Sequence, residues 1–359
     1  MEAKQKVSGR IFGLDLIKAV AIAVVILVHL KYYSAGKFGV GVVENTLFRL
    51  SSIGVPLMFM VNGDLLFSRG FDLDKHAKKT ARLVLIILVW RLLSLPLMCE
   101  IVQISWRDLG LTEIVSYMFG KEIENVPLGH FWFIYVLVSL YLMFPVLRVA
   151  YDSAEGKRSL VFFAVTCLVI SFGIKFLADL WGVIGTAQGH GEISFGSLYS
   201  KWIFSRYGYA FVYFIIGAFA TQWISWLHEK LGTRYRFILL AVGILSLAVL
   251  VTFMSYIEKA NDDFLVLALC LSLYALLRDA GTPPAPLASA VKVVGTNTLG
   301  IYLLHMFPLM YLRMNPQAFL PETYDAVCIV GIVFTILMGC TVVSAVCRHV
   351  PVLGNLFKL

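Results

Sequence analysis

Three polar side chains interrupt an otherwise apolar stretch near the start of the chain, IFGLDLIKAVAIAVVILVHL at residues 11–30. They are Asp15, Lys18 and His29. A helix turns by about 100° per residue, so Lys18 and His29 project from one face, about 16 Å apart along the axis. Histidine exchanges protons near neutral pH, which makes His29 a candidate general base. We expect one polar path along this helix, with Lys18 and Asp15 near its inner end.

Simpler interpretations of these residues remain open. A lysine near the end of a span can extend its ammonium to the membrane surface and pair with an aspartate three residues earlier, as Lys18 could with Asp15. His29 could form an interhelical hydrogen bond without taking part in a reaction. Polar groups inside a bilayer are nevertheless costly and commonly functional, which favours a site here.

Two more histidines are expected at a similar depth in other helices. His130 begins the stretch GHFWFIYVLVSLYLMFPVL, and His305 lies well along TNTLGIYLLHMF. Both fall in the outer half of their predicted helices, where they could converge with His29. No H-x-x-x-H spacing and no suitable carboxylate accompanies them, so we expect no metal site.

A cationic group is expected at the cytoplasmic mouth. Lys78, Lys79 and Arg82 lie at the start of one apolar stretch, and Arg91 lies near its middle. Such charges can follow from topology alone, because cytoplasmic loops collect Lys and Arg. The alternative interpretation is a site for the phosphates of a nucleotide-like donor. Arg91 needs an anionic partner or water at its depth.

The elements that must hold these residues are transmembrane helices. The chain has 359 residues, 59% hydrophobic and only 14% charged, with a mean hydropathy of +0.83. Soluble proteins carry roughly a quarter charged residues, and the solid apolar runs also exclude a disordered chain or a membrane barrel. We predict an all-α polytopic membrane protein with about ten transmembrane helices in a single domain, residues 1–359. The predicted spans are 11–32, 50–67, 82–104, 130–149, 159–180, 206–226, 235–255, 263–278, 293–314 and 326–347.

Charge alternates from loop to loop. Basic residues gather at the N-terminus, as Lys4, Lys6 and Arg10, and in every second loop, whereas loops 105–129 and 256–262 hold Glu124 and Glu258. This pattern predicts that both termini are cytoplasmic. It also accounts for the net charge of +8 without a nucleic-acid partner. Loop 181–205, expected outside, could cover a substrate entrance or be an ordinary surface loop.

Four motifs, in order along essentially the whole chain, resemble the acyltransferase-3 family of membrane acyltransferases that decorate bacterial surface polysaccharides. The first is the helix-one set of Asp15, Lys18 and His29. The second is VPLMFMVNGDLLF at residues 55–67. The third is HFWF at 130–133, and the fourth is TLGIY at 298–302 followed by His305. The third motif is most similar to the branch of the enterobacterial common antigen O-acetyltransferase, which has ten helices.

The resemblance implies transfer of an acyl group, usually acetyl from acetyl-CoA, to a sugar hydroxyl at the bacterial inner membrane. It implies that His29 is the catalytic base and that Lys79 and Arg82 match a basic pair that holds CoA. The expected partners are membrane lipid and a glycan or lipid-linked sugar acceptor, with no metal and no nucleic acid. The candidate residues are, for catalysis, His29, Lys18 and Asp15; for cofactor binding, Lys79, Arg82 and Arg91; for substrate binding, His130, Trp132, Tyr302 and His305.

The chain departs from the family pattern at three places. Lys18 and Lys79 replace arginines, which keeps the charge but loses the planar fork of the guanidinium. Asn62-Gly63-Asp64 stands where the family has Ser-Gly-Tyr. A different acyl group, such as succinyl, is therefore an alternative donor group.

Two other classes of function fit a ten-helix chain. A transporter or flippase for a glycan lipid or small solute is one, although no inverted repeat or matched pair of broken helices supports it. A non-catalytic membrane scaffold or sensor is the other, and it predicts that Lys18 and His29 tolerate apolar replacement.

Overall fold

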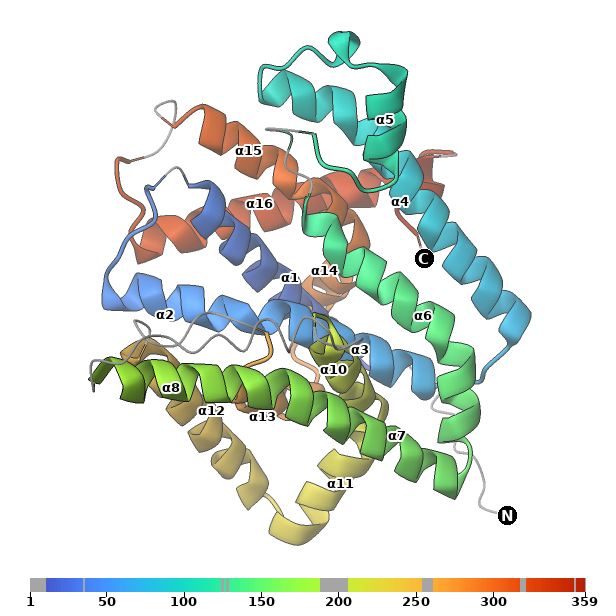
Figure 1. The fold of residues 1–359 in the computed structure, drawn as a ribbon, viewed down its shortest axis with the longest axis vertical. Helices are drawn as coiled ribbons and strands as arrows, with labels where there is room; N and C mark the ends of the chain where they lie inside the picture. Colours follow the sequence, from blue (N-terminus) through green and yellow to red (C-terminus); the bar gives the residue numbers. More distant parts are fainter. Residues whose placement is uncertain are drawn as a thin grey trace.

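The computed structural model describes residues 11–34, 36–123, 126, 129–187, 206–253, 261–316, 321–351 and 353–358. Within these ranges the chain folds into helices joined by turns and two isolated bridges, without any strand (Figure 1). The predicted all-α membrane fold is confirmed. The helices are α1 (Phe12–Tyr33), α2 (Val42–Leu50), α3 (Gly54–Phe67), α4 (Leu73–Ile101), α5 (Leu111–Met118), α6 (Trp132–Tyr151), α7 (Ala154–Leu168), α8 (Ile174–Ala187), α10 (Gly208–Ala218), α11 (Ala220–Leu231), α12 (Arg234–Thr252), α13 (Phe264–Arg278), α14 (Ala285–Leu304), α15 (Met306–Met314) and α16 (Ala326–Cys347).

The apolar helices match the predicted spans closely. Among the described residues, eight helical segments are long and apolar enough to cross a membrane, and the bent pair α10–α11 makes a ninth. The eighth predicted span corresponds to α13, whose 15 residues fall short of the roughly 20 that a full crossing needs. All ten predicted stretches therefore coincide with helix.

Several predicted spans have different boundaries in the structure: α4 begins at Leu73 rather than at residue 82, and α14 begins at Ala285 rather than at residue 293. The second predicted span begins at Val42 rather than at residue 50, because α2 runs through a short 3-10 turn into α3. Hydropathy missed this start because Glu44, Asn45 and Arg49 lower the average of an otherwise helical segment. The predicted loop 181–205 is wrong at its beginning, since α8 continues to Ala187 after a π-helical turn.

Two other predicted spans are not straight. The span predicted at 206–226 consists of α10 and α11, which meet at an angle of 61°. The span predicted at 293–314 is interrupted at His305, between α14 and α15. Pro308 explains this interruption, because it has no N–H to donate to the carbonyl of Leu304. The interruption fixes the position of a histidine that the sequence already singled out.

Several helices begin at a residue whose side chain accepts a backbone hydrogen bond. Asp72, Ser153, Asp263 and Asp325 accept from N–H groups two or three residues further on, at the starts of α4, α7, α13 and α16. Such caps satisfy donors that have no partner inside the helix. They fix where these helices begin after a turn.

Helix α1 is the centre of the bundle. It contacts α3, α13, α14, α15 and α16, and Figure 1 shows it near the middle of the molecule. Ile17, Ala21 and Ile26 are fully buried on it. By contrast, α12 and α16 leave large apolar side chains such as Phe237 and Phe334 exposed, as expected for helices that face lipid. The helix with the candidate base is thus packed against several other helices.

Helices α3 and α10 touch through their backbones. A Cβ atom added to Gly63 would lie 2.0 Å from the carbonyl oxygen of Phe214, and one added to Gly217 would lie 1.9 Å from that of Met60. No side chain fits in such a gap. The contact is the close packing of small residues that membrane helices use.

Gly217→Ala is therefore expected to destabilise the protein by about 1–3 kcal/mol, because the new methyl group forces α10 away from α3. Thermal unfolding in detergent measures the effect. Gly339→Ala in α16 is the matched control, since nothing lies within 4 Å of a Cβ added there. Equal unfolding midpoints for the two variants would contradict the backbone contact.

Some expectations fall on parts of the chain outside the described residues. These are the basic N-terminal residues Lys4, Lys6 and Arg10, the acidic Glu124 and Glu258, and residues 188–205 of the predicted outer loop. The cytoplasmic placement of both termini stays a prediction. All six cysteines lie in described segments and are free.

Candidate active site

The three histidines expected at similar depth lie together. The ring centroids of His29 and His305 are 5.2 Å apart, those of His130 and His305 are 5.2 Å apart, and those of His29 and His130 are 6.3 Å apart. They come from α1, from the 3-10 turn before α6 and from the junction of α14 with α15. His305 is fully buried and His130 is 5% exposed, whereas His29 is partly exposed. We call these three residues the histidine cluster.

Hydrogen bonds orient two members of the cluster. Nδ1 of His305 lies 2.7 Å from the carbonyl oxygen of Tyr302, one turn earlier. The hydroxyl of Tyr302 donates to the carbonyl oxygen of His130. Both ring nitrogens of His130 and Nε2 of His305 are buried without a hydrogen-bond partner in the described structure. Buried nitrogens of this kind are costly, so they indicate a place where another molecule or residue supplies the partner.

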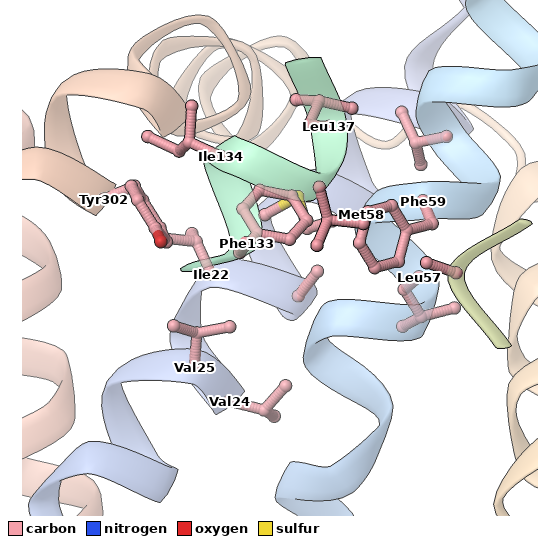
Figure 2. Packing of buried hydrophobic residues seen from close by; sticks show 14 of the residues in the cluster. Ile22, Val24, Val25, Leu57, Met58, Phe59, Phe133, Ile134, Leu137 and Tyr302 are labelled. Atoms are coloured by element: carbon pink, nitrogen blue, oxygen red, sulfur yellow. The ribbon is translucent and has the colours of Figure 1, made fainter. Parts of the chain in front are cut away.

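A large cavity approaches the cluster from the other end of the bundle. Its volume is about 710 Å³, and Lys18, Asp15 and Val25 of α1 line one wall. Phe133 and Tyr302 line it as well, with ring centroids 5.5 Å apart (Figure 2). The Tyr302 ring lies 5.4 Å from that of His130. His29 lies one helical turn beyond Val25. We call this space the central cavity.

Five cationic side chains line the central cavity, and they come from five different segments. Close contacts tie several of these segments together: the Gly13 backbone abuts the carbonyl of Arg278, and Arg348 donates to the carbonyl of Thr296. The carboxylate of Asp15 lies 3.7 Å from the ammonium of Lys18. The five cations, which define the cationic end of the cavity, are Lys18, Arg69, Lys79, Arg278 and Arg348.

Apolar side chains line the central cavity together with the cations. They include Ile134 and Leu137 of α6, Met58 of α3 and Val25 of α1, which Figure 2 shows within one group of buried apolar side chains. The arrangement suits a long molecule with an anionic head, an apolar stem and a reactive group at its tip. The cavity provides cations, and its lining residue Tyr302 lies beside imidazoles, which can move protons.

Residues 11–346 match the family model described as an acyltransferase domain. The chain belongs to the acyltransferase-3 family. It is a multi-pass membrane acyltransferase. The searches of curated proteins and of solved structures gave no match.

In this acyltransferase one member of the predicted basic pair, Lys79, lies at the cationic end, and the other, Arg82, does not. Lys79 lines the central cavity, with its ammonium 5.6 Å from the centre of the Tyr141 ring. Arg82 is not part of the lining, and its guanidinium donates to the carbonyl of Asn355 at 2.9 Å. Arg82 thus binds the segment that follows α16.

Arg91 is not brought to the central cavity. It is fully buried, donates to the carbonyls of Tyr117 and Lys121, and forms an ion pair with Glu122 at 3.4 Å. Its guanidinium also lies 4.3 Å from the centre of the Tyr117 ring. Burial raises the pKa of Tyr117, and the charge of Arg91 opposes this only in part. The required anionic partner is therefore Glu122, and Arg91 anchors the segment that leads to His130.

Trp132 lies beside the histidine cluster without joining it. Its ring stacks on that of Tyr207, with centroids 5.8 Å apart and planes at 13°. Trp132 is half-buried at the start of α6, two residues after His130. The pair forms an aromatic surface next to the cluster.

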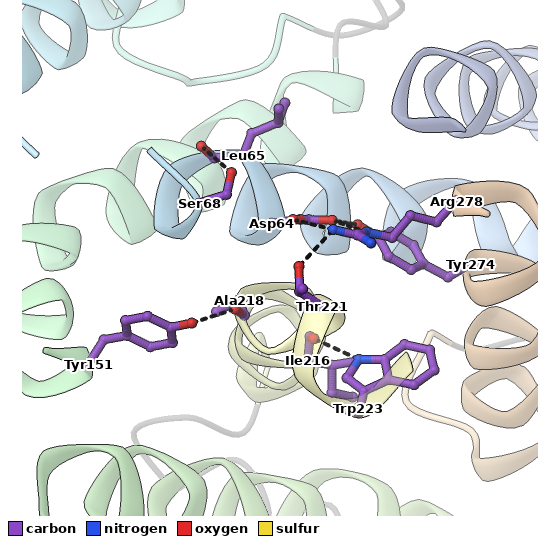
Figure 3. A network of polar contacts seen from close by, with 10 residues as sticks. All are labelled: Asp64, Leu65, Ser68, Tyr151, Ile216, Ala218, Thr221, Trp223, Tyr274 and Arg278. Carbon is purple, nitrogen blue, oxygen red and sulfur yellow. Dashed lines mark hydrogen bonds and ion pairs between the residues drawn. The ribbon is translucent and has the colours of Figure 1, made fainter. Parts of the chain in front are cut away.

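A buried charge network of the acyltransferase was missed from the sequence. Nε of Arg278 lies 2.7 Å from Oδ2 of Asp64, and the same oxygen accepts from the hydroxyl of Tyr274 at 2.9 Å (Figure 3). Arg278 also donates to Thr221 at 2.8 Å. The departure at Asp64 thus has a partner on α13. The available signal was an acidic residue deep in α3, which requires a cation nearby.

Asn62, the other departure in α3, also has a partner. Its Oδ1 accepts from the hydroxyl of Tyr141 at 2.9 Å, and its Nδ2 donates to the carbonyl of Met58 at 2.8 Å. Asn62 and Tyr141 both line the central cavity. The altered turn therefore forms part of the cavity wall.

Proposed function

We propose that this membrane acyltransferase moves an acyl group, acetyl in the simplest case, from acyl-CoA to a hydroxyl of a cell-surface or lipid-linked glycan at the bacterial inner membrane. One observation carries the proposal: a single cavity joins five cations to Tyr302, whose ring lies 5.4 Å from that of His130 and 5.7 Å from that of His305. The similarity to the common-antigen branch favours the O-acetyl product.

The cationic end is the proposed position of the donor's phosphates. Lys18, Lys79 and Arg348 offer N–H donors and positive charge there, and CoA is a cytoplasmic anion. The Lys18–His29 distance along α1 is about 16 Å, close to the length of an extended pantetheine arm. The apolar side chains that line the cavity suit that arm, so the thioester would come to rest near the histidine cluster.

His29 is the proposed general base. Its imidazole takes the proton of the acceptor hydroxyl as that oxygen attacks the thioester carbonyl. The new C–O bond forms, the C–S bond breaks, and the proton passes from His29 to the leaving sulfur. The transfer needs neither a metal nor a redox step. Asp15 pairs with Lys18 and fixes the position of that ammonium.

The acceptor is proposed to approach from the side opposite the donor. His130 offers two buried ring nitrogens that lack a partner in the described structure, and Trp132 with Tyr207 offers an aromatic surface of the kind that sugar rings pack against. Tyr302 and His305 complete this wall. A lipid-linked glycan at the outer face of the inner membrane fits such an approach.

Mass spectrometry of surface glycans tests the proposal. Cells with the protein are expected to contain a glycan that is heavier by the mass of one acyl group per modified sugar, and cells without it are not. Membranes supplied with acetyl-CoA labelled in the acetyl group should transfer the label to the glycan. Solute uptake into vesicles without any glycan modification would instead support the transporter alternative.

Lys79→Gln is expected to raise KM for acyl-CoA about tenfold and to leave kcat within about twofold. Loss of one charged contact to a phosphate corresponds to roughly 1.4 kcal/mol of binding, which affects the ground state and the transition state alike. Lys75→Gln on the same helix is the control, because its side chain is 85% exposed and pairs with Asp72. An unchanged KM for Lys79→Gln would remove this residue from the donor site.

A further inference from the structure

The segment that follows α16 folds back onto the central cavity. It begins with a 3-10 turn (Leu353–Leu356), and we call residues 353–358 the distal segment. Phe357 of this segment lines the cavity together with Arg348, one of the five cations of the cationic end. The distal segment therefore supplies part of the wall beside the proposed position of the donor's phosphates.

The ring of Phe357 holds the distal segment to the bundle. Its side chain is 2% exposed, and its ring lies 5.4 Å from that of Trp90 on α4, at 85°. A Cβ atom added to Gly300 would lie 2.7 Å from Cδ1 of Phe357, so the ring also rests against α14. Asn355 and Lys358 of the segment are exposed. Burial of this aromatic ring is thus an anchor, since such rings bury a large apolar area.

Two guanidinium groups hold the backbone of the distal segment. Arg82 donates to the carbonyl of Asn355 at 2.9 Å, and Arg348 donates to the carbonyl of Phe357 at 3.0 Å. Arg82 follows Lys79 by three residues on α4, so it projects from nearly the same face as this cavity-lining lysine. A guanidinium binds a charged phosphate oxygen more strongly than a neutral carbonyl oxygen. The carbonyls of the segment therefore occupy groups that an anionic donor would bind better.

We propose that the distal segment is an inhibitory latch on the donor site: the phosphates of entering acyl-CoA replace the carbonyls of Asn355 and Phe357 on Arg82 and Arg348, and the segment moves away. This inference rests on the proposed function. Because the closed latch and the bound donor use the same guanidinium groups, closure lowers the apparent affinity for the donor in proportion to the fraction of open molecules. Bound donor disfavours closure to the same extent.

Phe357→Ala removes the anchor and leaves both guanidinium groups in place. We expect KM for acyl-CoA to fall at least about threefold, with kcat within about twofold, because more molecules are open. If the ring only completed the cavity wall, its loss would weaken donor binding and raise KM. Phe334→Ala is the matched control, because this ring is 61% exposed on α16, and its KM should equal the wild-type value. An unchanged or higher KM for Phe357→Ala would overturn the latch.

Spin labels measure the movement without any transfer reaction. Lys358→Cys on the distal segment and Lys75→Cys on α4 replace exposed side chains and accept nitroxide labels. The background carries serine at Cys328 and Cys347, the two partly exposed cysteines. Addition of CoA is expected to create a second distance between the two labels. An identical distance distribution with and without saturating CoA would overturn the proposal.

Failure of the latch and failure of the proposed function give different results. If the proposed function is wrong, wild-type membranes transfer no label from acetyl-CoA to glycan. If only the latch is wrong, the wild-type protein transfers label, but CoA leaves the distance between the two spin labels unchanged.

Discussion

Replacing His29 with alanine is expected to lower kcat for acyl transfer by about 10²–10⁴-fold, the contribution of a positioned general base. The hydroxyl of a sugar is a weak nucleophile until its proton is removed, and His29 is the histidine of the cluster that lies on α1, one turn beyond the cavity lining. KM for acyl-CoA should stay close to the wild-type value, because the cationic end is untouched. Label transfer to glycan in purified membranes measures both constants.

His228→Ala is the control for His29→Ala. His228 is exposed on α11, where its ring lies 6.0 Å from that of Tyr235. We expect wild-type activity from this variant. Full acyl transfer by His29→Ala would show that another group removes the proton, and the assignment of the base would be wrong.

Replacing Asp64 with leucine should destabilise the fold by about 3–5 kcal/mol. The change leaves the guanidinium of Arg278 without its carboxylate in a mostly buried position and removes the acceptor of the Tyr274 hydroxyl. Breaking one half of a mostly buried ion pair is costly because the remaining charge loses its partner where it is poorly hydrated. Thermal unfolding in detergent is the measurement, and a large drop of the midpoint is expected.

The exposed pair of Asp152 with Arg148 is the control for this effect. The carboxylate of Asp152 is 57% exposed and lies 3.1 Å from Nε of Arg148. Asp152→Leu is expected to change the free energy of unfolding by no more than about 1 kcal/mol. A double variant, Asp64→Leu with Arg278→Met, should regain part of the lost stability because it removes the unpaired charge. No gain in the double variant would contradict the ion-pair explanation.

Hydropathy and helix geometry predicted where residues lie along each helix. The apolar stretches predicted the spans because a helix that crosses the bilayer must be mostly apolar. The similar depth of His29, His130 and His305 suggested that their side chains could lie together. The structure confirms that their rings are neighbours. Their chemical roles remain proposals.

Which helix faces which could not be predicted from the same patterns. Asp64 and Arg278 are separated by 214 positions in the chain, and Arg91 finds Glu122 in a loop that was predicted only as an outer segment. Arg278 and Arg348 have the composition of cytoplasmic loop charges, and only the packing of α13 and α16 against α1 turns them into cavity lining. The depth of a residue in the membrane can be predicted from its own helix alone. Its contacts with residues of other helices depend on the packing of the whole bundle.

The burial of α1 has a consequence for the choice of acyl group. Because the 22-residue α1 is packed against several other helices, the separation of Lys18 and His29 along it is fixed. In the proposed function, all acyl-CoA donors share the same pantetheine arm. They would therefore place the thioester carbonyl at the same position near His29, whatever acyl chain is attached. Selectivity between short and bulky acyl chains would then depend on the space beyond that carbonyl position. Enlarging this space is expected to change which acyl group is transferred.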